Sequence, residues 1–214
     1  GHAPGGNGRN GLLRYNFLMW SEAEKFLRKD KYIGPLVKKW GSCTITPKLN
    51  IDYFQGLVGD IIGQQLSGRV ADVIESRLKD KIKGRITPDK ILNLKDEEVR
   101  SCGMAWSKVR AIKDLALKTK KGELKVKILN KLPDEEVRKE LIAVKGIGPW
   151  TADMFLMFKL GRPDIFPVED LGIRKGFEKV TGKRFDKVKS AKFAEKSWKP
   201  HRTVASWYLW RSLE

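Results

Sequence analysis

The sequence has little cysteine: only Cys43 and Cys102 occur among 214 residues. Two cysteines are too few for a disulfide framework, a structural zinc site or a cysteine-ligated iron–sulfur cluster. They favour a reducing compartment. No apolar run approaches the roughly 20 residues of a membrane span, and the start lacks the apolar core of a signal peptide. We therefore expect a soluble protein that is not exported.

Acidic residues are scarce relative to basic ones. The chain has 26 Asp and Glu against 44 Lys and Arg, which gives a formal net charge of +18. This excess favours a polyanionic partner, and nucleic acid is the first candidate. Charge alone leaves open the alternative that the basic surface serves only solubility or thermostability.

Alternating strand patterns are also scarce, whereas from Leu12 onward apolar residues recur at three- and four-residue spacing. We therefore predict an all-α protein. The segment "DYFQGLVGDIIGQQL" predicts a helix with one apolar face, formed by Phe54, Leu57, Val58, Ile61 and Ile62. Ser67 can cap a next helix, whose predicted apolar face holds Val70, Val73, Ile74 and Leu78. Residues 64–67, "QQLS", would then lie at a helix junction.

Other segments carry helix start and stop signals. Thr87 followed by Pro88 predicts an N-cap and a first helical residue. Asp96 begins an acidic run that favours another helix start, and Gly103 is expected to end that helix. The pentapeptide "DEEVR" occurs at 96–100 and at 134–138, as either a duplicated helix–turn–helix unit or a coincidence.

The stretch "AVKGIGPWTADMF", residues 143–155, predicts a tight hairpin between two helices. Gly146 and Gly148 can adopt backbone conformations that are closed to other residues. Pro149 suits the first position of the second helix. Free amides in such a turn, together with the helix N-terminus, would bind an anion such as a DNA phosphate. A plain helix–helix turn is the alternative.

Asp170 follows in "DIFPVEDLGIRKGF", just ahead of a short predicted helix. From spacing alone, an N-cap is the favoured interpretation of this residue. The motifs together, however, resemble those of a known family. "VKGIGPWTA" followed by the aspartate of "PVEDLGIRKG" is similar to the helix-hairpin-helix DNA glycosylases. "IIGQQLSGRVA", "CGMAWSKVRAIKDLA" and "WKPHRTVASWYLW" resemble the 3-methyladenine DNA glycosylase II branch. The resemblance covers roughly residues 12–212.

The resemblance implies a reaction and its central residues. The family hydrolyses the N-glycosidic bond of a damaged base flipped out of duplex DNA. Asp170 matches the family aspartate, whose carboxylate would stabilise the sugar cation and help place the attacking water. Trp150 stands where members with lyase activity carry a lysine, so we expect a monofunctional enzyme. Trp150 also matches an aromatic residue that lines the base pocket.

Further pocket positions follow from the same resemblance. Trp210 matches a second pocket aromatic, which would stack on a cationic alkylpurine. Met154 and Leu171 stand where certain relatives have tyrosine, so the pocket is expected to be less polar. Core packing is preferred for Trp198 and Trp207. No role is assigned to Trp106.

Contacts with DNA are expected at the helix junction and at the hairpin. Gln65 is the best match for the side chain that fills the gap left by the flipped nucleotide, with Gln64 as the alternative. The expected DNA-binding set is completed by Ser67, Lys145, Gly146, Gly148 and Thr151. We expect no catalytic metal and no required cofactor, although hairpin carbonyls could bind a monovalent cation. The partner would be damaged double-stranded DNA, bound by a monomer.

The resemblance also implies two helical lobes with a DNA-binding active-site cleft between them. Residues 52–163 would form one lobe, and residues 12–51 plus 164–214 the other. Residues 1–11 would be a disordered tail that begins with an expression remnant. The protein would act in the cytoplasm or nucleoid of a prokaryote, or in a eukaryotic nucleus. Alternatives are a glycosylase for another lesion (hypoxanthine, ethenoadenine or an oxidised purine), a non-catalytic DNA-binding protein and a basic scaffold.

Overall fold

The computed structural model describes residues 20–48 and 51–214. Helix is the only regular secondary structure in these two ranges, which confirms the predicted all-α class. The expected tail at 1–11, and the helical pattern of residues 12–19, lie outside the described residues. The chain divides into two compact units. We call Lys48–Leu160 the central unit, and the segments before and after it the terminal unit. The lobe boundaries at 52 and 163 stay a prediction.

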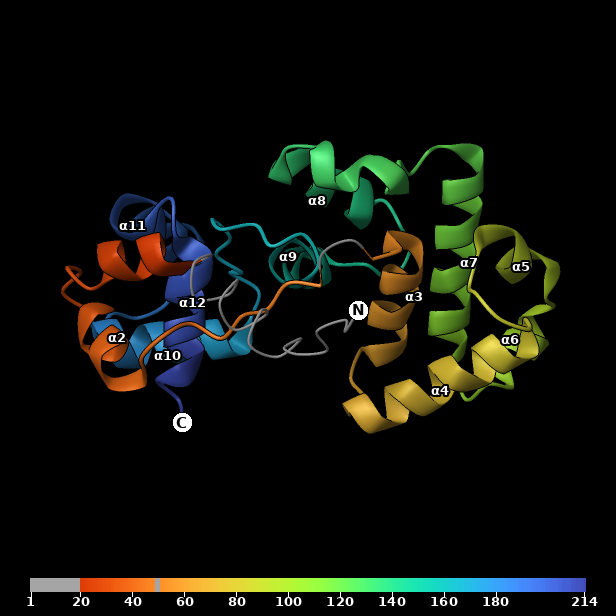
Figure 1. The fold of residues 1–214 in the computed structure, drawn as a ribbon, viewed down its shortest axis with the longest axis horizontal. Helices are drawn as coiled ribbons and strands as arrows, with labels where there is room; N and C mark the ends of the chain where they lie inside the picture. Colours follow the sequence, from red (N-terminus) through yellow and green to blue (C-terminus); the bar gives the residue numbers. More distant parts are fainter. Residues whose placement is uncertain (1–19, 49–50) are drawn as a thin grey trace, which may run out of the picture. The chain divides into compact units, whose positions relative to one another are not determined.

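The central unit is a bundle of seven α-helices and one 3₁₀ helix among its described residues (Figure 1). They are α3 (Tyr53–Gly63), α4 (Gly68–Lys81), α5 (Pro88–Asn93), α6 (Asp96–Arg100), α7 (Trp106–Lys121), η1 (Val126–Lys131), α8 (Asp134–Ile142) and α9 (Pro149–Phe158). The long helix α7 packs against α3, α5 and α6, while α8 packs against α9. The hairpin therefore connects the last two helices of this unit.

The apolar face of α3 is buried as predicted, with exposures of 3% or less at Phe54, Leu57, Val58, Ile61 and Ile62. The prediction for α4 was half wrong. Ile74 and Leu78 are buried, but Val70 and Val73 are each 45% exposed. The physical reason is that helical spacing defines a stripe without fixing its width. Packing against α3 covers only part of the stripe, so Val70 and Val73 remain in contact with solvent.

Helix starts follow the sequence signals closely. The Thr87 side chain accepts a hydrogen bond from the Lys90 amide, and Pro88 opens α5 as predicted. Ser67 occupies the N-cap position of α4, but its side chain makes no capping hydrogen bond. Gly103 has φ +107° in the turn after α6, a conformation that favours glycine. The local sequence signals therefore predict where a helix begins more reliably than they predict whether the N-cap side chain makes a hydrogen bond.

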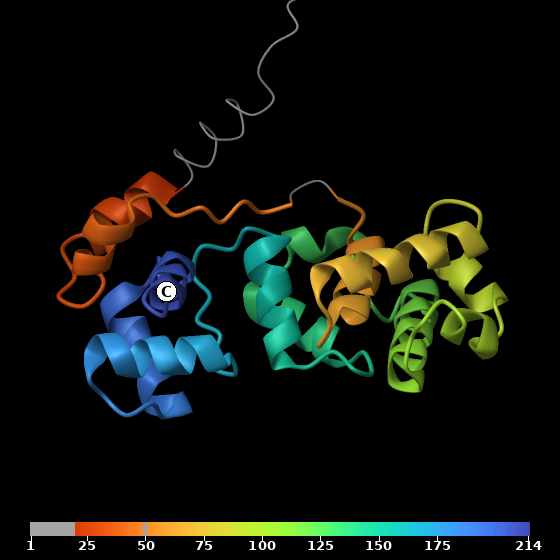
Figure 2. The ribbon, with the colours of Figure 1, turned by 90° about the horizontal axis from the view of Figure 1, so that it is seen from below.

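The terminal unit contains a helical segment at 20–27, α2 (Gly34–Trp40), α10 (Leu171–Thr181), α11 (Lys187–Trp198) and α12 (Arg202–Arg211). Figure 2 shows α10 to α12 in blue shades. Its core includes a cluster of ring contacts among Phe166, Phe177, Phe185, Phe193 and Trp198. Trp198 and Trp207 are buried, which agrees with the core packing preferred for both.

Two glycines allow α10 and α12 to pack closely. A Cβ added at Gly176 would lie 2.4 Å from the Leu209 carbonyl oxygen, and one at Gly172 would lie 2.7 Å from Cδ1 of Trp210. Both distances are shorter than carbon side chains tolerate, so α12 can approach only because these positions lack side chains. This close approach brings Trp210 to the N-terminus of α10, where Asp170 lies.

Candidate active site

The predicted site residues lie in both units. Gln64, Gln65, Ser67, Lys145, Gly146, Gly148, Trp150, Thr151 and Met154 belong to the central unit, and Asp170, Leu171 and Trp210 to the terminal unit. The structure therefore brings these residues together as two groups, each within its own unit.

Asp170 caps helix α10 and contacts Trp210. Its Oδ1 accepts hydrogen bonds from the Ile173 amide and from Nε1 of Trp210, each at 2.8 Å. The N-cap expected from spacing and the acid expected from the resemblance are thus the same half-buried residue. Two donors on one oxygen fix the orientation of the carboxylate, which is what a group that stabilises a developing charge requires.

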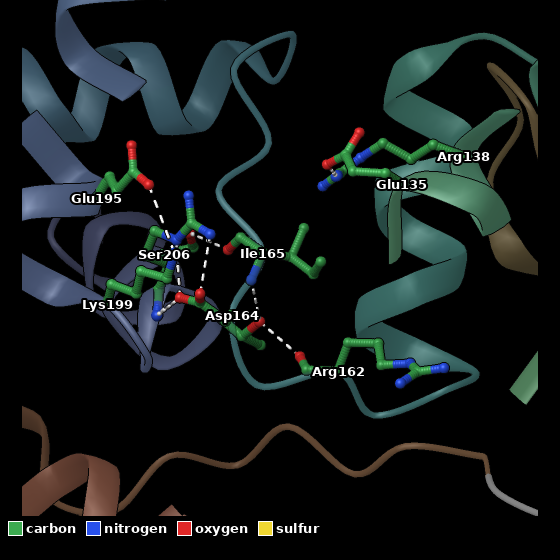
Figure 3. Close-up of polar contacts among 10 residues, drawn as sticks. Glu135, Arg138, Arg162, Asp164, Ile165, Glu195, Lys199 and Ser206 are labelled. Atoms are coloured by element: carbon green, nitrogen blue, oxygen red, sulfur yellow. Dashed lines mark hydrogen bonds and ion pairs between the residues drawn. The ribbon is translucent and has the colours of Figure 1, made fainter. Parts of the chain in front are cut away.

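The segment that precedes Asp170, residues 162–165, is hydrogen-bonded to the N-terminal turn of α12 (Figure 3). Arg202 donates three hydrogen bonds to Asp164: from Nε at 2.7 Å, from Nη2 at 2.9 Å and from its backbone amide at 3.3 Å. Thr203 accepts the amide of Ile165 at 3.0 Å and donates to the Arg162 carbonyl at 2.6 Å. Helix α12 also carries Trp210. This one helix therefore positions both the segment that precedes Asp170 and the indole that donates to Asp170.

A pocket of about 350 Å³ opens beside Asp170 within the terminal unit. Three basic residues, Arg174, Arg184 and Lys187, are among those that line it. Leu171, which the resemblance assigns to the base pocket, also lines it and is 60% exposed.

The hairpin adopts the predicted tight turn, with one correction. Gly146 has φ +77°, and a Cβ there would lie 2.9 Å from Cβ of Ala111 on α7. Gly148 instead has φ −97° and ψ 176° as the N-cap of α9, a conformation open to any residue. Only Gly146 therefore needs glycine for its backbone angles, because the turn reverses at that residue and Gly148 already starts the next helix.

Asp114 on α7 anchors the start of the hairpin. Its Oδ2 accepts the Lys145 amide at 2.8 Å and Nζ of Lys118 at 2.6 Å. Burial alone would raise the pKa of this carboxyl, but the two hydrogen bonds and the positive charges of Lys118 and Lys145 together outweigh burial and lower the pKa. On the other side, Arg138 of α8 binds Glu135 (Figure 3) and donates to the buried Asp153 of α9 at 2.7 Å. These contacts connect the start of the hairpin to α7 and connect α8 to α9.

The two glutamines of the helix junction have different surroundings. Nε2 of Gln64 donates to the Gly146 carbonyl at 2.9 Å and to Oγ1 of Thr151 at 3.3 Å. Gln64 is therefore bound to the hairpin. Gln65 is exposed and has φ +57°, a strained conformation that favours glycine or asparagine. The exposed Gln65 at the tip of this turn stays the predicted wedge.

Lys108, a residue to which the sequence assigned no role, supports this turn. Its Nζ donates to the carbonyls of Ile62 at 2.6 Å and of Gln64 at 2.8 Å, which lie at the end of α3. A cation at a helix C-terminus interacts favourably with the helix dipole. Burial lowers the pKa of Lys108 below the ordinary lysine value. The signal that could have revealed this contact is a lysine in the first turn of an otherwise apolar-faced helix.

Trp150 lies between two pockets of the central unit. It is 42% exposed. A pocket of about 410 Å³ on one side is lined by Gln65, Lys108 and Gly146, among others. A second, of about 240 Å³, is lined by Gly59, Asp60, Gly63, Gln64, Trp150, Thr151 and Met154. Trp150 and Met154, predicted together for the base pocket, thus share the smaller one.

Asp60 is the pocket residue that the sequence interpretation missed. It is half-buried on α3, and its Oδ1 pairs with Nζ of Lys159 at 3.2 Å. Burial raises the pKa of its carboxyl, while Lys159 acts in the opposite direction. The available signal was that Asp60 is the only charged residue in the α3 sequence "YFQGLVGDIIG". The expectation of a less polar pocket was based on Met154 and Leu171 and did not include Asp60.

The described residues have several further features. Among the described residues, no three His, Cys, Asp or Glu side chains form a group that could hold a metal ion. In the same part of the chain, no helix is long and apolar enough to cross a membrane. Cys43 and Cys102 are free and buried. Trp106 is 40% exposed. The guanidinium carbon of Arg100 lies over the Trp106 ring, 5.0 Å from the ring centre.

Comparisons with known proteins agree with this arrangement. Residues 58–200 match the model of the HhH-GPD superfamily base excision DNA repair proteins. DNA-3-methyladenine glycosylase 1 of Schizosaccharomyces pombe is 33% identical over 165 residues, 74% of this chain and 72% of that protein. A crystal structure of DNA-3-methyladenine glycosidase from Bacillus halodurans matches with a TM-score of 0.78 and 31% identity, over 89% of this chain and 88% of the other.

A second solved structure is the Schizosaccharomyces pombe 3-methyladenine DNA glycosylase in complex with abasic DNA. It matches with a TM-score of 0.74 and 30% identity, over 89% of this chain and 96% of that one. The family match spans about two thirds of the chain and includes the helix junction, the hairpin and Asp170. The chain belongs to the HhH-GPD superfamily of base excision DNA repair proteins.

Proposed function

We propose that the protein is a monofunctional DNA glycosylase that hydrolyses the N-glycosidic bond of alkylated purines in duplex DNA, and so initiates base excision repair. Substrates would be of the 3-methyladenine and 7-methylguanine type. The observation that carries the proposal is the oriented carboxylate of Asp170, held by Trp210 and by the α10 N-terminus, in a chain whose relatives are named 3-methyladenine glycosylases.

In this reaction the bond between the purine nitrogen and the sugar C1′ breaks, and its electron pair goes to the base. An alkylated purine that carries positive charge becomes neutral as it leaves, so it needs little help from a general acid. The sugar becomes an oxocarbenium-like cation. The Asp170 carboxylate would stabilise that cation and accept a hydrogen bond from the attacking water, whose oxygen bonds to C1′ while its proton passes to solvent.

Trp150 supports hydrolysis over lyase chemistry. Lyase members of the family need an amine at this position to attack C1′, and an indole cannot form that adduct. Its ring instead offers a face for a cationic base, worth about 0.5 to 2 kcal/mol of cation–π attraction. Borohydride trapping tests whether the enzyme lacks lyase activity. A covalent enzyme–DNA adduct would contradict the monofunctional assignment.

Duplex DNA is the partner that the basic charge and the hairpin favour. The exposed turn at Gly146, followed by the N-terminus of α9, would offer amides to a phosphate. Gln65 would enter the gap left by the flipped base and hydrogen-bond the orphaned partner base. We further propose that the protein acts as a monomer, in the cytoplasm or nucleoid of a prokaryote or in a eukaryotic nucleus.

No cofactor is needed for the chemistry proposed above. A monovalent cation on the hairpin carbonyls is a finer part of the proposal, since oxygen ligands suit hard cations. The carbonyl of Gly146 accepts Gln64, and that of Val144 accepts the Ile147 amide. Each carbonyl oxygen has a second lone pair, so these residues fit such an ion. The bound ion would add a positive charge at the hairpin, where a DNA phosphate would bind. Tighter DNA binding in potassium than in tetramethylammonium chloride is the expected result, and equal affinities would contradict it.

The primary test is release of 7-methylguanine and 3-methyladenine from methylated duplex DNA by the wild type and by Asp170→Asn. Asparagine is also a good N-cap, so the variant should fold. We expect release by the wild type and nearly none by the variant. Release of neither base would refute the alkylpurine proposal, and hypoxanthine, ethenoadenine and oxidised purines in the same panel would then identify another lesion. Equal rates would favour a role for Asp170 in structure alone.

A further inference from the structure

The pocket between α3 and α9 contains an acid whose function the proposed reaction does not account for. Asp60 lines this pocket of about 240 Å³ together with Trp150 and Met154. Pockets for drug-sized ligands measure roughly 300–1,000 Å³, so this smaller volume suits a single nucleobase. An aromatic face and a carboxylate thus border the same base-sized space.

Asp60 is placed there by the helix that bears it. Gly59 and Gly63 on either side of it also line the pocket. A Cβ added at Gly63 would meet no atom within 4 Å, so the missing side chain leaves open space in front of α3. At Gly59 a Cβ would lie 3.2 Å from Oε2 of Glu75 on α4. The two glycines therefore leave Asp60 as the charged side chain that α3 presents to the pocket.

The carboxylate of Asp60 pairs with a lysine and also lines the pocket. Lys159 pairs with Oδ1 at 3.2 Å, yet the pocket-lining set includes Asp60 and not Lys159. Lys48 adds a second positive charge nearby, and Glu75 a negative one. Of this ion pair, Asp60 is the member that lines the pocket. Because the site is partly shielded from water, this charge acts more strongly than a surface charge would.

We propose that Asp60 is a specificity-determining residue, whose carboxylate favours a positively charged alkylpurine in the pocket beside Trp150. Cation–π attraction to the ring and Coulomb attraction to Asp60 act on the same feature of the base, its positive charge. Neither acts on an undamaged neutral purine. This inference rests on the proposed function.

The substitution Asp60→Asn tests the inference, because it removes the charge and keeps the shape. Asparagine keeps a side-chain oxygen that can accept a hydrogen bond from Nζ of Lys159, the partner of Asp60. Thermal unfolding of the variant checks that it remains folded. Glu75→Gln is the matched control: it removes a neighbouring carboxylate, paired with Lys79, that is not among the residues lining the pocket.

Two quantities should be measured for the wild type and both variants. One is kcat/KM for 7-methylguanine release, and the other is affinity for duplex DNA with a tetrahydrofuran abasic site, which puts no base in the pocket. We expect Asp60→Asn to lower kcat/KM about five- to twentyfold and to leave abasic-site affinity unchanged. Glu75→Gln should change neither. Excision of neutral hypoxanthine should fall less than that of 7-methylguanine.

The outcomes separate the two claims. If Asp60→Asn releases 7-methylguanine as fast as the wild type, the inference is wrong while the proposed function stands. If Asp60→Asn lowers abasic-site affinity or thermal stability in proportion to kcat/KM, Asp60 has only a structural role and the inference is also wrong. If the wild type releases no alkylated purine, the proposed function fails and this inference fails with it.

Discussion

The indole Nε1 of Trp210 donates a hydrogen bond to Oδ1 of Asp170 at 2.8 Å, and Gly172 makes this contact sterically feasible. A Cβ at Gly172 would lie 2.7 Å from the Trp210 ring and 3.0 Å from the Asp170 carboxylate. The pair links the C-terminal helix to the N-terminus of α10. The position of the carboxylate thus depends on Trp210, which lies 40 residues further along the chain.

Trp210→Phe removes the N–H donor and keeps an aromatic ring. Since a hydrogen bond to a charged group contributes about 1.5–3 kcal/mol, we expect excision of 7-methylguanine to slow about 10- to 100-fold. Trp207→Phe is the control, because Trp207 lies on the same helix and contacts Arg211 and Tyr208. Equal activity of the wild type and Trp210→Phe would show that this hydrogen bond does not position the carboxylate for catalysis.

Lys108→Met removes the two hydrogen bonds that hold the end of α3. The Gln65 turn should then lose its position, and because small displacements are costly in catalysis, excision should fall about 10- to 100-fold. A double-mutant cycle with Gln65→Ala checks the route, since the two effects should be strongly non-additive. Lys113→Met is the control: Lys113 lies on the same helix and binds the Leu94 carbonyl. Additive effects would contradict a role for Lys108 through the turn.

Asp114→Asn should destabilise the hairpin in a pH-dependent way. The folded-state pKa of Asp114 is lowered, so its contribution is present above the ordinary carboxyl pKa of about 3.9 and is lost as pH falls through the lowered value. At pH 7 we expect a loss of about 1–3 kcal/mol in unfolding free energy. Urea denaturation at pH 7 and near pH 3 measures it. If the difference in unfolding free energy between the wild type and Asp114→Asn is as large near pH 3 as at pH 7, the proposed contribution of the Asp114 carboxylate is wrong.

Affinity for duplex DNA should fall steeply with salt, because phosphate contacts release counterions. We expect at least a tenfold loss between about 50 and 200 mM salt. Lys145→Ala should reduce the slope of log affinity against log salt by about one. Titration of fluorescent duplex DNA measures both. An affinity insensitive to salt would mean that the net charge of +18 serves solubility and not DNA binding.

Helix positions were predictable from the sequence because they depend on local chemistry. Thr87 and Pro88 started a helix as expected, and the apolar stripe of α3 is buried. The exposed Val70 and Val73 were not predictable, since only the packed structure shows how much of α4 its neighbour covers. The angles of Gly148 likewise depend on where α9 begins.

The site was predictable in part. Motif resemblance singled out Asp170, but the sequence could not show that Gly172 lets Trp210 reach it, because that contact spans 40 residues. Asp60 was missed because the apolar face of its helix dominated the pattern. Only the pocket shows that this charge faces the same space as Trp150.

The most direct test of the account is the single-turnover rate of 7-methylguanine release from duplex DNA, with enzyme in excess, for the wild type and Asp170→Asn. The same samples should be assayed for affinity to abasic-site DNA. We expect Asp170→Asn to be at least about 100-fold slower while its affinity for abasic-site DNA stays the same. Equal release rates at equal affinity would contradict the central claim that the Asp170 carboxylate carries the reaction.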